Sequence, residues 1–213
     1  FLSHIHRMCT ALFPRPKLLI LNTPHNPTAT LESLELFREI VAMAKRFGFM
    51  VLHDFAYAKI TFDGYVAPSF LQVPGARDVG VEFGSFSKSY NMAGWRLGMA
   101  VGNPELLRAL AQVSFNTSMG LFGPSQAAAI EALTGDQNWM VERNQIYQER
   151  RDIVVEGLRA MGLEPLCPKA TLYVWAKLPA GYTDSLEFSK WVLDQSGVWL
   201  TSGMFFGPEG EGY

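Results

Sequence analysis

The sequence is poor in cysteine, with only two among its 213 residues. Cys9 and Cys167 lie far apart and fit no C-x-x-C pattern, so they indicate no redox motif. Isolated cysteines of this kind are typical of a reducing compartment, where thiols pack as small hydrophobic side chains. We therefore predict that the protein is cytoplasmic.

The sequence also lacks an excess of charge of either sign. Its 18 basic and 20 acidic side chains leave a formal net charge of −2. No surplus of lysine or arginine is available for a phosphate backbone or an anionic lipid surface, so we predict no nucleic-acid partner. The longest stretch without charged residues, 109–130, is interrupted by polar residues and proline and cannot cross a bilayer. We therefore predict no membrane partner.

Several catalytic motifs are absent. The stretch 94–98 reads Gly-Trp-Arg-Leu-Gly and lacks the G-x-G-x-x-G of a dinucleotide turn. His53 lies next to Asp54, but the sequence has no G-x-S-x-G of a hydrolase nucleophile. Neighbouring residues of a strand point to opposite faces, so we expect His53 to pack on the far face. Residues 4–9 form an H-x-H-x-x-C pattern without a further matching ligand, so we predict no metal site.

The sequence does contain an alternation of apolar runs and amphipathic segments. Apolar runs predict buried strands at residues 17–21, 49–52, 79–86 and 97–101. Between the first two strands, apolar residues recur at helical spacing over 31–47, and Gly48 follows where a helix would end in a left-handed turn. Strand, helix and strand in this order predict an α/β fold with a mostly parallel sheet flanked by helices.

The second half of the sequence predicts further helices and then a smaller unit. Helical spacing indicates helices at residues 104–111, 124–133 and 136–161. Strand, helix and strand patterns then predict a small α+β domain, with these elements at residues 171–176, 185–195 and 198–200. We place the boundary near Arg143, which gives a large domain of residues 1–143 and a small C-terminal domain of residues 144–213.

Polar and ionisable side chains follow the predicted strands. In a parallel α/β sheet, ligands bind beyond the carboxyl ends of the strands. We therefore expect these side chains to converge on one edge of the sheet and to suit a charged, planar, phosphorylated ligand. The candidate residues are Asn26, Asp54, Tyr57, Ser85, Ser87, Lys88 and Arg96.

Pyridoxal 5'-phosphate needs a set of groups of this kind. Asp54 is the candidate for keeping the pyridine nitrogen protonated by charge pairing. Lys88 is the candidate for a Schiff base with the aldehyde and for moving a proton between two carbons. Asn26 and Tyr57 can donate hydrogen bonds to the ring oxygen. The groups suited to the phosphate are the hydroxyls of Ser85 and Ser87 and the guanidinium of Arg96.

These residues resemble the motifs of a known family, the fold-type I class I/II aminotransferases. The shared motifs are an Asn-Pro-Thr turn, an Asp-x-x-Tyr, and a Ser-x-x-Lys that is followed by an arginine. They begin here at Asn26, at Asp54 and at Ser85, in that order along the chain. The resemblance implies that Lys88 is the Schiff-base lysine, and it gives the other candidates the roles described above.

The resemblance covers most of the sequence, from about residue 17 to residue 207. The stretch 85–98 is most similar to the alanine (glutamate-pyruvate) and diaminopimelate-type branch. Residues 169–173 resemble the small-domain loop that lines the substrate pocket. The fold implied is a partial large domain of a pyridoxal-phosphate-dependent transferase with a small α+β C-terminal domain.

The resemblance also implies that the sequence lacks both ends of a family member. Members carry an upstream phosphate-binding turn with an aromatic residue stacked on the cofactor. They also carry, shortly after the region that corresponds to residues 203–207, an arginine that binds the substrate α-carboxylate. We therefore expect this segment to be inactive alone. The family further implies a homodimer in the full-length form.

The function predicted is an aminotransferase that moves an amino group between an amino acid, such as alanine or glutamate, and a 2-oxo acid. Its partners would then be small molecules, with Lys88 as the proton shuttle. Two alternatives stay open. One is a pyridoxal-phosphate-dependent β-lyase, in which the same carbanion expels a leaving group. The other is a non-catalytic, aminotransferase-like effector domain of a transcription regulator.

Overall fold

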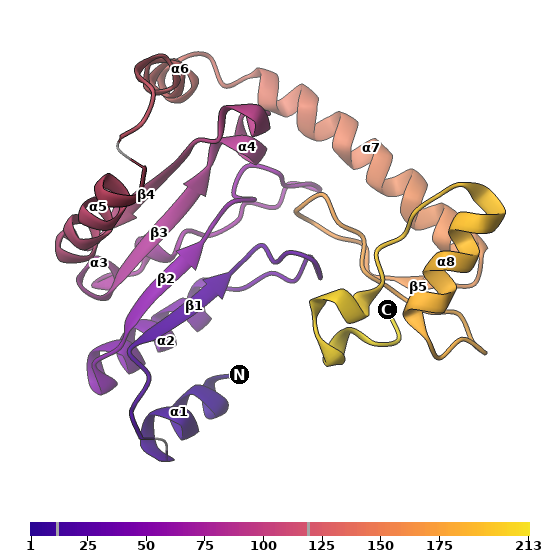
Figure 1. The fold of residues 1–213 in the computed structure, drawn as a ribbon, viewed down its shortest axis with the longest axis horizontal. Helices are drawn as coiled ribbons and strands as arrows, with labels where there is room; N and C mark the ends of the chain where they lie inside the picture. Colours follow the sequence, from indigo (N-terminus) through magenta and orange to yellow (C-terminus); the bar gives the residue numbers. More distant parts are fainter. Residues whose placement is uncertain (12, 119) are drawn as a thin grey trace.

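The computed structural model describes residues 1–11, 13–118 and 120–213. The four-stranded sheet and the helices up to residue 134 form one part, the sheet part, and the elements from residue 164 onward form the other, the C-terminal part. The long helix α7 runs between the two parts (Figure 1). The strands are β1 Leu18–Asn22, β2 Met50–Asp54, β3 Gly80–Ser85, β4 Gly98–Gly102, β5 Glu164–Pro165 and β6 Ala176–Lys177. The helices are α1 Leu2–Ala11, α2 Leu34–Phe47, α3 Ala76–Val79, α4 Phe86–Ser89, α5 Pro104–Ser118, α6 Gly123–Thr134, α7 Trp139–Ala160 and α8 Ser185–Ser196.

The main sheet has the strand order β1-β2-β3-β4. The pairs β1–β2 and β2–β3 are parallel, and β4 pairs with β3 in the antiparallel direction. In register, Asn22 lies opposite Asp54, and Ser85 lies opposite Gly98. The carboxyl ends of the three parallel strands and the start of β4 therefore share one edge, and the predicted mostly parallel sheet is confirmed.

Helix α2 begins and ends at residues suited to those positions. The Ser33 hydroxyl accepts a hydrogen bond from the Leu36 amide at 3.2 Å, which satisfies an amide that the first turn leaves free. Gly48 ends the helix with φ 73° and ψ 34°, and its amide donates to the Ala44 carbonyl at 2.9 Å. The left-handed turn predicted at Gly48 is confirmed.

The core of the sheet part lies between α2 and one face of the sheet. Phe37, Ile40 and Ala44 of α2 are fully buried and belong to one cluster with Val51 of β2 and Phe70. Burial of a large apolar side chain contributes about 1.5–3 kcal/mol. On β1, the side chains of the opposite face are exposed, since Leu18 is 48% and Ile20 is 65% exposed. This core accordingly holds β1, β2 and α2 together from one side.

The C-terminal part differs from the prediction at both expected strands. Of the predicted strand 171–176, only Ala176 is strand, as the first residue of β6, which pairs with β5. Residues 169–171 instead bond to the loop after β2, where Thr171 N donates to Ile60 O at 3.0 Å. Residues 198–200 form no strand either. Their apolar side chains fit the pattern of a buried strand, but among the described residues they pair with no strand.

Other boundaries differ by less. Helix α5 continues to Ser118, beyond the predicted end at residue 111, and α1 was not predicted. The predicted strand 79–86 gives way at Phe86 to the short helix α4, which carries Lys88. The long helix and the helix at 185–195 are confirmed as α7 and α8. None of the described helices is both long enough and apolar enough to span a bilayer.

Candidate functional site

The sheet brings the predicted site residues to one edge. Asp54 is the last residue of β2 and Ser85 the last residue of β3. Lys88 lies in α4, directly beyond β3, and Arg96 lies just before β4. Because β4 runs antiparallel to β3, its start lies at the same edge as the end of β3. Residues far apart in the sequence are thus gathered by topology.

The turn that carries Asn26 is tied to the end of β2. The Asn22 side chain donates from Nδ2 to the Asp54 carbonyl at 3.2 Å and accepts at Oδ1 from the Asn26 amide at 2.9 Å. The Asn26 side chain itself is exposed and makes no hydrogen bond with the described residues. Asn22 is therefore a positioning residue that sequence analysis missed, although its place at the end of β1 was a usable signal.

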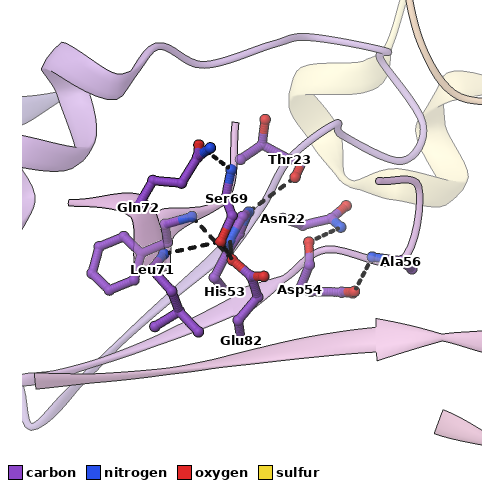
Figure 2. A network of polar contacts seen from close by, with 10 residues as sticks. Asn22, Thr23, His53, Asp54, Ala56, Ser69, Leu71, Gln72 and Glu82 are labelled. Atoms are coloured by element: carbon purple, nitrogen blue, oxygen red, sulfur yellow. Dashed lines mark hydrogen bonds and ion pairs between the residues drawn. The ribbon is translucent and has the colours of Figure 1, made fainter. Parts of the chain in front are cut away.

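Behind Asp54 lies a buried polar network, drawn in Figure 2. His53 is fully buried, and its Nε2 donates to the Thr23 carbonyl at 2.9 Å, while Nδ1 lies 3.0 Å from Glu82 Oε2. The same Glu82 oxygen accepts from the Ser69 hydroxyl at 2.7 Å. The network joins the ends of β1, β2 and β3, and it agrees with the expectation that His53 packs away from the site.

The carboxylate of Asp54 is on the other side of the strand. Its Oδ1 accepts from the Ala56 amide at 3.2 Å, as Figure 2 also shows. No other hydrogen bond or ion pair to this carboxylate occurs among the described residues. The second oxygen is thus available to a cationic or N–H group of a ligand.

The backbone around Lys88 is fixed by Arg143 of α7. Arg143 is only 6% exposed, and its guanidinium donates to the carbonyls of Lys88, Ser89 and Lys59. Burial lowers the pKa of Arg143. The Lys88 Nζ, by contrast, makes no hydrogen bond or ion pair within the part of the chain that the structure describes. Lys88 thus combines a fixed backbone with an amine that has no partner among the described residues, and this combination suits a covalent bond to a ligand.

Tyr57 is buried, and its hydroxyl lies 2.5 Å from the hydroxyl of Tyr173. The pKa of the Tyr57 phenol is raised, first by burial and also by the negative charge of Asp54. Tyr57 therefore stays protonated at neutral pH and keeps a hydrogen to donate.

The candidates for phosphate binding remain accessible. Ser85 and Ser87 are half-buried, and their hydroxyls make no hydrogen bond with the described residues. Arg96 is exposed, with one bond from Nη1 to the Ala93 carbonyl at 3.2 Å. Its backbone has φ 52° and ψ 50°, a left-handed conformation that costs a non-glycine residue about 1–2 kcal/mol. Strain held at such a position is a feature of functional sites.

Comparisons with known proteins show the family of the chain. The profile of a family described as "Aminotransferase class I and II" matches residues 4–212. An LL-diaminopimelate aminotransferase of Moorella thermoacetica is 48% identical over the whole chain and 54% of its own length. The glutamate-pyruvate aminotransferase AlaC of Escherichia coli is 48% identical over 99% of this chain and 52% of its own length.

Solved structures give the same result. The structure of BacF from Bacillus subtilis, without ligand, superposes with a TM-score of 0.87 at 38% identity. This match covers 93% of the present chain and 53% of BacF. The chain thus spans about half the length of the curated relatives and of the solved structures it matches.

Proposed function

The chain belongs to the class I and II aminotransferase family, and we propose that the protein it forms is an aminotransferase acting between an amino acid and a 2-oxo acid. The observation that carries the proposal is the meeting of Asp54, Lys88 and Arg96 at one edge of the sheet. There, a carboxylate, an amine and a guanidinium supply the anionic, the nucleophilic and the cationic group that the reaction needs.

Members of this family use pyridoxal 5'-phosphate, and the residues at the sheet edge fit that cofactor. The fit rests on the uncommitted Asp54 oxygen, the Lys88 amine and the accessible Arg96 guanidinium described above. When bound, this cofactor supplies an electron sink for the electrons left after the substrate loses its Cα proton.

Asp54 and Lys88 carry the reactive roles in the proposal. Asp54 pairs its negative charge with the protonated ring nitrogen, which favours the cationic form of the ring. Lys88 would hold the cofactor aldehyde through Nζ, and the same amine would move the substrate proton between two carbons. The hydrogen bond from Arg143 to the Lys88 carbonyl fixes the backbone that carries this amine.

The remaining residues hold and tune the ligand. Asn26 and Tyr57 donate hydrogen bonds to the ring oxygen, and the protonated state of Tyr57 suits that role. The groups that bind the phosphate are Ser85, Ser87 and Arg96, with Arg96 able to form two parallel hydrogen bonds. The Arg96 guanidinium, just before β4, and the hydroxyls of Ser85 and Ser87 would then bind the same anion.

We infer the substrate class from the names of the two relatives. Both are named as aminotransferases, one for LL-diaminopimelate and one for glutamate and pyruvate. We extend the proposal to alanine, glutamate or a similar amino acid, and to a homodimer in the cytoplasm; these points stay predictions. Neither the β-lyase nor the regulator alternative gains support, because these relatives are named as aminotransferases.

The test is an Asp54→Ala variant of the full-length protein, loaded with pyridoxal phosphate. Turnover of an amino acid with a 2-oxo acid should fall by several orders of magnitude, because the ring nitrogen loses the charge that keeps it protonated. An Asp194→Ala variant is the control, since Asp194 is exposed on α8. Near-normal turnover in the Asp54 variant would refute the assignment.

A further inference from the structure

A loop of the C-terminal part is bonded to the loop that follows β2. Phe62 N donates to Lys169 O at 2.8 Å, and Thr171 N donates to Ile60 O at 3.0 Å. These are the backbone bonds that replace the strand expected at 171–176. Because they join backbone to backbone, the second loop has a fixed place beside the residues that follow Asp54.

Within this loop, Thr171 has a conformation that β-branched residues rarely adopt. Its φ is 76°, and it is 1% exposed. Its hydroxyl accepts from the Tyr173 amide at 3.2 Å. A backbone of this kind costs about 1–3 kcal/mol and persists only where the surrounding contacts hold it. The contacts that hold Thr171 also fix where Tyr173 lies.

Tyr173 reaches back to Tyr57 across 116 positions of sequence. The two hydroxyls are 2.5 Å apart, and the rings meet edge to face with centroids 5.5 Å apart. Each phenol has one hydrogen, so only one of the two can donate in this bond. Since Tyr57 keeps its proton, that hydrogen is free for another acceptor whenever Tyr173 is the donor.

We propose that Tyr173 is a positioning residue of the site: its hydroxyl donates to Tyr57, and the Tyr57 hydrogen is thereby directed to the ring oxygen of bound pyridoxal phosphate. This role rests on the proposed function. The bond also polarises the Tyr57 hydroxyl and strengthens its own donation. The C-terminal loop thus acts on the cofactor through Tyr57, without touching it.

The experiment is a pH titration of the visible absorbance of the cofactor bound in the full-length protein. The absorbance follows the proton at Lys88 Nζ, and donation by Tyr57 lowers the proton affinity of that nitrogen. Tyr173→Phe should raise the midpoint by up to about one pH unit, and Tyr57→Phe by more. The double variant should have the midpoint of Tyr57→Phe, since Tyr173 acts only through Tyr57.

The controls separate this inference from the proposed function. Tyr182→Phe, at a half-exposed tyrosine of the same part of the chain, should leave the midpoint unchanged. An unchanged midpoint in Tyr173→Phe, or shifts that add in the double variant, would overturn the positioning role alone. A parent protein that keeps no cofactor absorbance after the unbound cofactor has been removed would contradict the proposed function and this role together.

A second readout does not use the cofactor. Urea midpoints of the cofactor-free parent, the two single variants and the double variant form a cycle that measures the coupling between Tyr57 and Tyr173. The loss in the double variant should be smaller than the sum of the single losses, because the first substitution already removes the bond. Strictly additive losses would show that no bond joins the two hydroxyls and would overturn the proposal.

Discussion

The sheet part and the C-terminal part are held together in different ways. In the sheet part, α2 packs on β2 through large side chains without solvent exposure, such as Phe37 and Ile40. In the C-terminal part, the aromatic cluster around Phe188 is accompanied by buried small polar groups and close backbone contacts. The Ser185 and Ser202 hydroxyls are buried and 2.7 Å apart, and the Ser185 amide donates to Glu211 at 2.7 Å.

This difference explains why the two parts were not equally predictable. Apolar periodicity records which side chains face a shared core, and that is what builds the sheet part. Hydrogen bonds between distant loops leave no such period. The contact between Gly203 and Gly210, for example, depends on two glycines whose spacing matches no helix or strand.

The largest effect should come from removing an aromatic side chain from each part. Phe37→Ala should lower the free energy of unfolding by about 3–5 kcal/mol, because Phe37 is enclosed on all sides. Phe188→Ala in α8 should cost less, since its neighbours Tyr182 and Trp191 are 42% and 51% exposed and can close the space. Urea denaturation of both variants checks the order, and equal losses would contradict the comparison.

A second pair of variants tests glycines that are needed for different reasons. A Cβ at Gly203 would lie 2.1 Å from the Gly210 carbonyl oxygen, so Gly203→Ala should cost about 1–3 kcal/mol through overpacking. Gly48 has open space around its Cβ position but a φ of 73°, so Gly48→Ala should cost about 1 kcal/mol through backbone strain. Thermal unfolding measures both; a larger loss at Gly48 would contradict the account.

Loss of a helix cap should lower the stability of the two parts by similar amounts. Ser33 caps α2, and Asp184 caps α8 by accepting from the Glu187 amide at 2.8 Å. Substitution of either by alanine should cost about 1 kcal/mol, because each leaves one helix amide unsatisfied. Urea midpoints test this equality. A clear difference between the two caps would mean that packing, and not the cap itself, sets the cost.

The smallest effect concerns the ion pair that joins the parts. Arg151 of α7 donates to both carboxylate oxygens of Asp63, and this bond lowers the pKa of Asp63. A lowered pKa stabilises the folded state above about pH 4, and the contribution is lost as the pH falls through the folded-state value. Asp63→Asn should therefore lose less than about 1 kcal/mol at neutral pH and nothing in acid. A loss independent of pH would contradict this.

Most residues of the candidate site could be predicted from the sequence, because they follow strands whose apolar pattern is easy to find. Asn26, Asp54, Ser85 and Lys88 could be named once the strand ends were located. Arg143 could not, since its role depends on where a distant helix passes α4. The Tyr57–Tyr173 bond depends in the same way on a loop that pairs with no strand.

The proposed function depends most on Lys88, the amine that we propose to bind pyridoxal phosphate. The most direct test is reduction of the full-length protein with borohydride in the presence of the cofactor, followed by peptide mapping. We expect a label on Lys88 that is lost in Lys88→Ala and kept in Lys190→Ala, a change at an exposed lysine of α8. A label on another lysine, or none, would contradict it.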